Sequence, residues 1–170
     1  MKFKKVELNA FRAYKNKENG TFDFTLDDDG KIANFISIYA PNGFGKTSFY
    51  DGIEWGVTNR IARLDSFSKE ADAERKHTEQ VNGSRDKQHI LRNKDVGDSI
   101  EAYVKLSTNI QDFERKVEKI RKGGKDYPPK TNSVNDFFTS VILSQDGIDD
   151  FLKAHDDKTR YDIFFNYFGD

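Results

Sequence analysis

Residues 35–55 read FISIYAPNGFGKTSFYDGIEW, and this stretch decides the fold. The apolar run FISIY is typical of a buried strand, and the turn residues APNG end it. After that turn, apolar residues recur at helical spacing, at Phe49, Ile53 and Val57. The sequence therefore predicts a strand over 35–39, a glycine-containing loop and a helix that begins at Lys46.

The loop matches the phosphate-binding pattern G-x-x-x-x-G-K-[ST], with Ala40 in place of the first glycine. Its two glycines allow positive φ and let backbone amides approach an anion closely. Lys46 supplies charge to terminal phosphates, and the Thr47 hydroxyl can bind Mg²⁺. A turn that merely joins a strand to a helix is the alternative, but the flanks agree with the motif at every step. We predict a nucleoside triphosphate site contacted by Pro41, Asn42, Gly43, Phe44, Gly45, Lys46, Thr47 and, more remotely, Ser48.

Composition restricts the class of protein. The 170 residues suffice for one domain with a sizeable core, to which 15 Phe contribute. The absence of Cys excludes disulfides, thiolate metal sites and Cys nucleophiles. No long apolar segment is present, so we expect a cytoplasmic protein with no membrane partner.

The formal net charge of −1 does not by itself indicate a nucleic-acid partner. Basic residues are nevertheless concentrated in two segments, 2–17 and 115–125. Most such segments are solvated faces of strands or helices. Contact between these segments and DNA is therefore a secondary prediction.

Alternating apolar residues predict further strands at 2–10, 21–26 and 99–108, with a strand partner for 99–108 between Phe113 and Gly123, and a short apolar run predicts another strand at 137–144. The first of these strands is expected to continue through 11–14. Two strands before the phosphate-binding segment indicate an antiparallel β layer attached to a nucleotide-binding core. Residues 58–98 read as irregular structure with short helices. Helices are predicted from Ile148 and from Asp157 or Lys158, the latter with a core-facing aromatic stripe at Tyr161, Phe164, Phe165 and Phe168.

One expected element is missing from the sequence. Hydrolysis by P-loop enzymes needs an apolar strand that ends in Asp or Asp-Glu, and neither apolar run after the loop ends this way. A serine-glycine-glycine clamping motif is absent as well. Either the protein binds a nucleotide without hydrolysing it, or the acidic half of the site lies beyond residue 170.

Several segments, taken in order, resemble the N-terminal half of the ATPase head of the SMC and SbcC type, within the ABC-type ATPase superfamily. The matching segments are VELNAFRAY, APNGFGKTS, HILRNKDVGDSIEAYVKLS, FERKVEKIRKG, FFTSVILSQDGIDDFL and YFG. The resemblance covers most of the chain and is weakest over 58–88. It implies an α/β fold: an N-terminal lobe with a mixed β-sheet, an antiparallel β layer and flanking helices.

The resemblance also implies site residues. Gln145 matches the glutamine that ligates Mg²⁺ and contacts the attacking water, and Arg12 matches an arginine that reaches the nucleotide phosphates. Both roles suit the chemistry, since Gln offers a neutral oxygen to a hard cation and Arg a charged fork to phosphate. Their alternatives are a surface Gln and a surface Arg. ATP and Mg²⁺ are the implied cofactors, with Lys46 and Gln145 as catalytic residues.

In such proteins a coiled coil and a C-terminal lobe follow this lobe, so residues 1–170 would form half of an active site. The implied partners are the chain's own C-terminal lobe, a second head in a homodimer, double-stranded DNA, and a nuclease or other effector subunit. The implied setting is the nucleoid, in DNA repair, chromosome organisation or anti-phage defence. Two alternatives remain open: a nucleotide-gated regulatory module without turnover, and a transporter-type ATPase.

Overall fold

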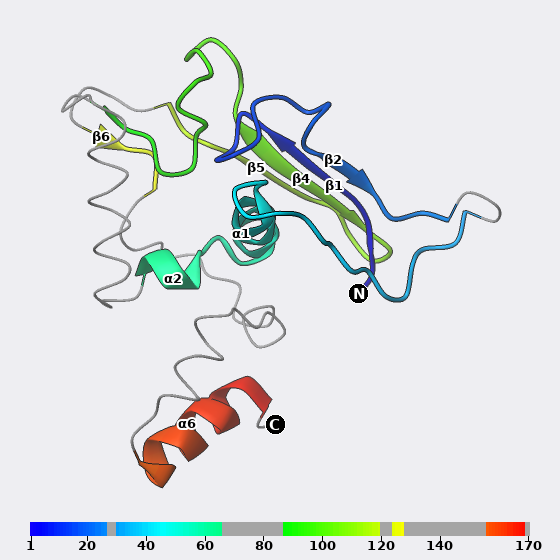
Figure 1. Cartoon of the computed structure of the whole chain (residues 1–170), viewed down its shortest axis with the longest axis vertical. Helices are drawn as coiled ribbons and strands as arrows, with labels where there is room; N and C mark the ends of the chain where they lie inside the picture. The colour runs from blue at the N-terminus through cyan, green and yellow to red at the C-terminus, as the bar shows by residue number, and fades with distance from the viewer. Residues whose placement is uncertain (27–29, 66–86, 120–123, 128–155, 169–170) are drawn as a thin grey trace.

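A computed structural model describes residues 1–26, 30–65, 87–119, 124–127 and 156–168 (Figure 1). Its main feature is a four-stranded antiparallel sheet in the order β2-β1-β4-β5. The strands are β1 (Phe3–Asn9), β2 (Thr21–Asp23), β4 (Tyr103–Thr108) and β5 (Phe113–Lys116). The predicted antiparallel layer is confirmed, and so is the second strand pair.

Three helices and a second, small sheet complete the described part of the chain. The helices are α1 (Lys46–Thr58), α2 (Ala62–Asp65) and α6 (Asp157–Phe168). The two-residue strands β3 (Lys87–Gln88) and β6 (Gly124–Lys125) pair in parallel. No helix in the described ranges is long and apolar enough to cross a membrane.

Helix α1 packs across one face of the large sheet, against β1, β4 and β5 (Figure 1). The alternation predicted for the first strand is confirmed, because Val6, Leu8 and Ala10 are fully buried. The approach of the helix is close: a Cβ added at Gly52 would lie 2.6 Å from a methyl of Leu8, and one at Gly56 would lie 2.5 Å from a methyl of Leu106. Glycine at these positions therefore fixes the distance between α1 and the sheet.

The strand predicted at 35–39 is not observed. These residues lie outside the sheets, and Phe35 and Tyr39 are 84% and 95% exposed. The physical reason is that no strand in the described ranges pairs with it, because β-propensity alone does not hold a strand without a ladder partner. The Ala33 amide, two residues before this segment, still donates a 2.9 Å bond to the carbonyl of Phe24, the residue that follows β2.

The predicted continuation of the first strand through 11–14 is also wrong. Ala10 and Arg12 both have φ of 47°, and Phe11 and Tyr14 exchange backbone hydrogen bonds of 2.9 and 2.8 Å. The chain therefore reverses direction here, in a segment that we call the 10–14 turn. Left-handed backbone at two non-glycine residues is unfavourable alone and requires tertiary contacts, which are described below.

Helix α6 has the predicted bounds but not the predicted environment. Tyr161 and Phe165 stack at 5.8 Å between ring centroids, yet Tyr161, Phe164 and Phe165 are between 49% and 61% exposed. The core position predicted for this stripe is therefore not observed at these three residues. The predictions for the strand at 137–144, the helix from Ile148 and Gln145 lie outside the described residues.

Gly20 gives a direct test of the packing of β1. It is buried, its carbonyl accepts a 2.9 Å bond from the Leu8 amide, and a Cβ at this position would lie 2.1 Å from the Leu8 carbonyl oxygen. Because that oxygen belongs to the backbone, it cannot move aside. We expect Gly20→Ala to lower the free energy of unfolding by at least about 2 kcal/mol.

The measurement is urea-induced unfolding of the parent and the variant. Gly97→Ala is the matched control, because the nearest atom to its added Cβ is 3.9 Å away. That variant should stay within about 0.5 kcal/mol of the parent. Equal stability of the parent and Gly20→Ala would contradict the described pairing at the end of β1.

Candidate phosphate-binding site

The loop before α1 has the backbone geometry of an anion site. Gly43 and Gly45 both have φ of 87°, a conformation that side-chain-bearing residues rarely adopt. Gly45 is the N-cap of α1, and it provides no side-chain hydrogen bond to the helix. The first turn of α1 contains no acidic residue. Its first amides, which lack partners inside the helix, can therefore bind an external anion.

Lys46 folds back over this loop. Its Nζ donates to the carbonyl oxygens of Ala40 (2.6 Å) and Pro41 (3.0 Å), while the Phe44 amide closes a turn onto Pro41 at 3.4 Å. The side chain is exposed, so the ammonium group can exchange a carbonyl for a phosphate oxygen without a desolvation cost. This arrangement fits a phosphate bound at the start of α1.

The remaining loop residues lie as follows. Pro41, Asn42, Phe44 and Thr47 are exposed around the loop, and the phenyl group of Phe44 is 71% exposed. Ser48 is different: it is 9% exposed, and its Oγ accepts a 3.3 Å bond from the Ala13 amide. Thr47 is thus exposed next to Lys46, whereas the Ser48 hydroxyl binds the 10–14 turn. Nucleotide contact at each of these residues stays a prediction.

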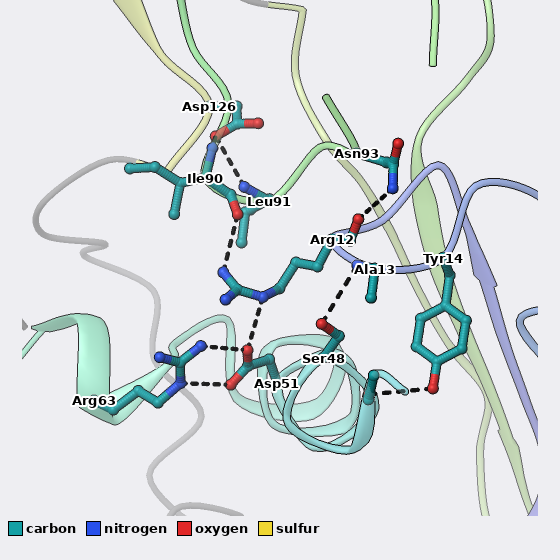
Figure 2. Close-up of polar contacts among 11 residues, drawn as sticks. Arg12, Ala13, Tyr14, Ser48, Asp51, Arg63, Ile90, Leu91, Asn93 and Asp126 are labelled. Atoms are coloured by element: carbon teal, nitrogen blue, oxygen red, sulfur yellow. Dashed lines mark hydrogen bonds and ion pairs between the residues drawn. The ribbon is translucent and has the colours of Figure 1, made fainter. Parts of the chain in front are cut away.

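Arg12 lies against α1 rather than in solvent, as Figure 2 shows. Its Nε is 2.8 Å from Oδ2 of Asp51, and its NH1 donates to the Ile90 carbonyl at 3.0 Å. Arg63 of α2 binds the same carboxylate through two bonds of 2.9 and 2.7 Å. The side chain of Asp51 is fully buried, and both arginines are about 15% exposed. The alternative of a surface Arg12 is therefore wrong, while its contact with phosphate stays a prediction.

Residues 90–93 hold the other side of the 10–14 turn. The Arg12 amide donates to the Leu91 carbonyl at 2.7 Å, and the Asn93 amide donates to the Ala10 carbonyl at 2.8 Å. The Asn93 side-chain amide donates to the Arg12 carbonyl (Figure 2). These bonds stabilise the two left-handed residues of the turn.

A carboxylate next to β6 in turn fixes residues 90–92. Asp126 accepts hydrogen bonds from the backbone amides of Ile90 (2.7 Å), Leu91 (3.1 Å) and Arg92 (2.8 Å). Burial raises the pKa of Asp126, and the three amide bonds oppose this effect. A continuous chain of polar contacts thus links Asp126, through Ile90 and Arg12, to Asp51 in α1 (Figure 2).

Sequence reasoning did not identify Asp51, Arg63, Asn93 or Asp126. A signal existed for Asp51, because it lies beside Ser48, Gly52 and Trp55 on the buried face of α1. A charged residue on such a face predicts a buried ion pair. The other three come from distant parts of the chain, and no local pattern marks them.

Glu54 is a second buried acid, one helical turn after Asp51. It is 6% exposed, and its Oε1 accepts a 3.0 Å bond from the Ala62 amide. Oε2 has no hydrogen-bond partner within the described part of the chain. Burial, and secondarily the charge of Asp51, raise the pKa of Glu54 to about 7.

The described residues contain no cluster of three or more His, Asp or Glu side chains that could hold a metal ion. Magnesium at this site would therefore rely on Thr47 and on oxygen ligands that the described acidic residues do not supply, chiefly the phosphates of a nucleotide. Gln145, the second predicted magnesium ligand, lies outside the described residues.

Asp51 provides a stability test of the buried contacts. Replacing it by Asn removes the charge that compensates two largely buried guanidinium groups while preserving the shape of the side chain. We expect Asp51→Asn to lower the free energy of unfolding by about 3 kcal/mol or more, as measured by urea denaturation. Asp95→Asn is the control, since Asp95 and Lys15 form a 2.9 Å pair on the surface, where solvent screens their attraction, and this variant should lose much less stability. Similar losses in the two variants would contradict this account.

Glu54 gives the protein a specific pH dependence. Its pKa of about 7 in the fold exceeds the usual value of 4.5, so the folded state holds the proton more tightly than the unfolded state between these values. The contribution of Glu54 is therefore most favourable below pH 4.5 and declines as pH rises to 7. In total the decline is on the order of 3 kcal/mol.

We expect Glu54→Gln, which mimics the protonated acid, to be more stable than the parent at pH 8 and to differ little at pH 5. Denaturation of both proteins at pH 5, 6, 7 and 8 tests this. Glu118→Gln, at an exposed position, should leave the pH profile unchanged. A difference between Glu54→Gln and the parent that does not vary with pH would contradict the assignment.

Comparison with known families matches residues 5–169 to a family described as an AAA domain. Comparisons with curated proteins and with solved structures found no match. Domains of this type are P-loop ATPases found in SMC-like proteins, and in general they bind and hydrolyse ATP with Mg²⁺. The match includes the glycine loop and the whole of α1, which begins at Lys46. The chain therefore belongs to the AAA domain family of P-loop ATPases.

Proposed function

We propose that the chain is the N-terminal half of an SMC/SbcC-like ATPase head, which binds Mg-ATP at the 41–48 loop and hydrolyses it once a C-terminal lobe and a second head complete the site. The observation that carries the nucleotide part is the geometry at the start of α1. Two left-handed glycines, an uncapped helix terminus and the Lys46 ammonium group surround the same position. Together they suit a chain of phosphates better than any other common ligand.

The exposed apolar segment at 35–39 supports a missing lobe. Phe35 and Tyr39 expose most of their side chains directly before the phosphate loop, and no described strand pairs with this segment. An apolar run of this type is stable next to other strands and costs free energy in water. A lobe that adds strands here would bury it beside the nucleotide.

Double-stranded DNA is the proposed partner of the assembled heads, on the strength of the SMC/SbcC resemblance. Surface charge adds little support in the described ranges. Lys116 pairs with Glu101 at 2.9 Å, and the Arg115 guanidinium donates to the Gly56 carbonyl of α1 at 2.9 Å. Arg115 thus serves the packing of α1, and Lys119 is the better residue for a charge-reversal test of DNA contact.

ATP turnover by the full-length protein, with and without duplex DNA, tests the proposal. We expect DNA to stimulate turnover, and we expect Lys46→Ala to weaken ATP binding by about 100-fold, since a charged contact to phosphate is lost. Lys158→Ala, an exposed lysine in α6, is the matched control and should bind ATP like the parent.

Each outcome of this experiment has a distinct meaning. Tight Mg-ATP binding without turnover under either condition would favour a nucleotide-gated module. Turnover that DNA does not change would contradict the DNA-handling role but keep the ATPase. Equal ATP affinity in Lys46→Ala and the parent would contradict the assigned site.

A further inference from the structure

The carbonyl of Gly45 accepts two hydrogen bonds. The first comes from the Phe49 amide at 2.8 Å and is the first bond of helix α1. The second comes from the hydroxyl of Tyr14 at 3.2 Å, across the gap between the 10–14 turn and the loop (Figure 2). Both lone pairs of this oxygen are therefore engaged, which fixes the peptide plane that it belongs to.

That peptide plane also contains the amide of Lys46. In a trans peptide, the C=O and N–H groups point in opposite directions. A carbonyl held toward Tyr14 and Phe49 therefore directs the Lys46 N–H out of the start of the helix, toward the position of a bound phosphate. Donation to the carbonyl also polarises the peptide and strengthens its N–H as a donor.

The ring of Tyr14 is held independently of its hydroxyl. It packs edge-on against Phe22, with 5.8 Å between the centroids, and Phe22 packs against Phe49 of α1 at 4.7 Å. The ring also lies directly on Gly45, where an added Cβ would be 3.3 Å from its Cζ and hydroxyl oxygen. Burial raises the pKa of Tyr14, so the hydroxyl stays protonated and remains a donor at neutral pH. A Phe at this position would keep the packing and lose only the bond.

The neighbouring residues of the turn contact the same helix at successive positions. The Ala13 amide binds Ser48, and Arg12 binds Asp51, so three consecutive residues of the turn reach Gly45, Ser48 and Asp51. Of the three contacts, the bond from Tyr14 is the one made to a glycine of the loop, at Gly45. The contacts of Ala13 and Arg12 are made further along α1, at Ser48 and Asp51.

We propose that Tyr14 is a positioning residue for the phosphate-binding loop: its hydroxyl holds the Gly45–Lys46 peptide so that the Lys46 amide faces the phosphates. This inference rests on the proposed nucleotide site. It assigns to the 10–14 turn a role in nucleotide affinity, in addition to its role in packing α1.

Tyr14→Phe in the full-length protein tests the inference, with two readouts. Mg-ATP affinity, measured by calorimetry, should weaken by about 3- to 10-fold, the effect of one neutral hydrogen bond. Amide hydrogen exchange without nucleotide should become faster over residues 43–49, because the loop loses one of its fixed points. Tyr103→Phe is the matched control: it also removes one hydroxyl bond, from Tyr103 to Glu7 on the sheet, and should change neither readout.

The two readouts separate failure of this inference from failure of the nucleotide site. Unchanged exchange and unchanged affinity in Tyr14→Phe would overturn the positioning role. Equal changes in Tyr14→Phe and Tyr103→Phe would overturn it as well, since the effect would then be a general loss of stability. A third outcome combines faster exchange over 43–49 in Tyr14→Phe with no ATP binding by the parent. It would support the positioning of the peptide and contradict the proposed function.

Discussion

The carboxylate of Asp51 has no exposed surface, so it must find its counter-charges inside the protein. Arg12 and Arg63 supply them from the 10–14 turn and from α2. A charge that is removed from water is tolerated only with such partners in good geometry, and the partners are thereby fixed as well. One carboxylate thus places two other segments, the 10–14 turn and α2, against the first two turns of α1. The glycine-containing loop leads directly into this helix, because α1 begins at the residue after Gly45.

The close approach of α1 to the sheet also fixes the position of this helix, on the face that packs against β1 and β4. Gly52 and Gly56 leave no room for a Cβ between helix and strands, so the helix rests against the side chains of Leu8 and Leu106. A larger residue would lift the helix and lengthen the contacts of Arg12 and Tyr14. Packing on one face and polar contacts on another therefore determine one position for the start of α1.

Local sequence was sufficient to predict α1, the glycine-containing loop before it and the strands that alternate clearly, such as β1 and β4. It was not sufficient for the 10–14 turn, because AFRAY carries no glycine, and its two left-handed residues, Ala10 and Arg12, are held by Leu91, Asn93 and Asp51 from other parts of the chain. The prediction of a strand at 35–39 failed for a different reason. These residues have strand propensity, but no strand in the described ranges lies beside them to form a ladder. Arg115 reads as part of a basic surface segment, yet it donates to α1, a contact that follows only from the pairing of β4 with β5.

That contact of Arg115 has an electrostatic consequence for α1. A helix carries partial positive charge at its start and partial negative charge at its end, and the last turn of α1 contains no basic residue of its own. Arg115 brings a cation from β5 to the Gly56 carbonyl in that last turn, where the negative end of the macrodipole lies. The opposite end has neither an acidic side chain in its first turn nor a side-chain cap. The fold thus places a cation at the negative pole of α1, while the positive pole keeps the partial charge that a bound anion would meet.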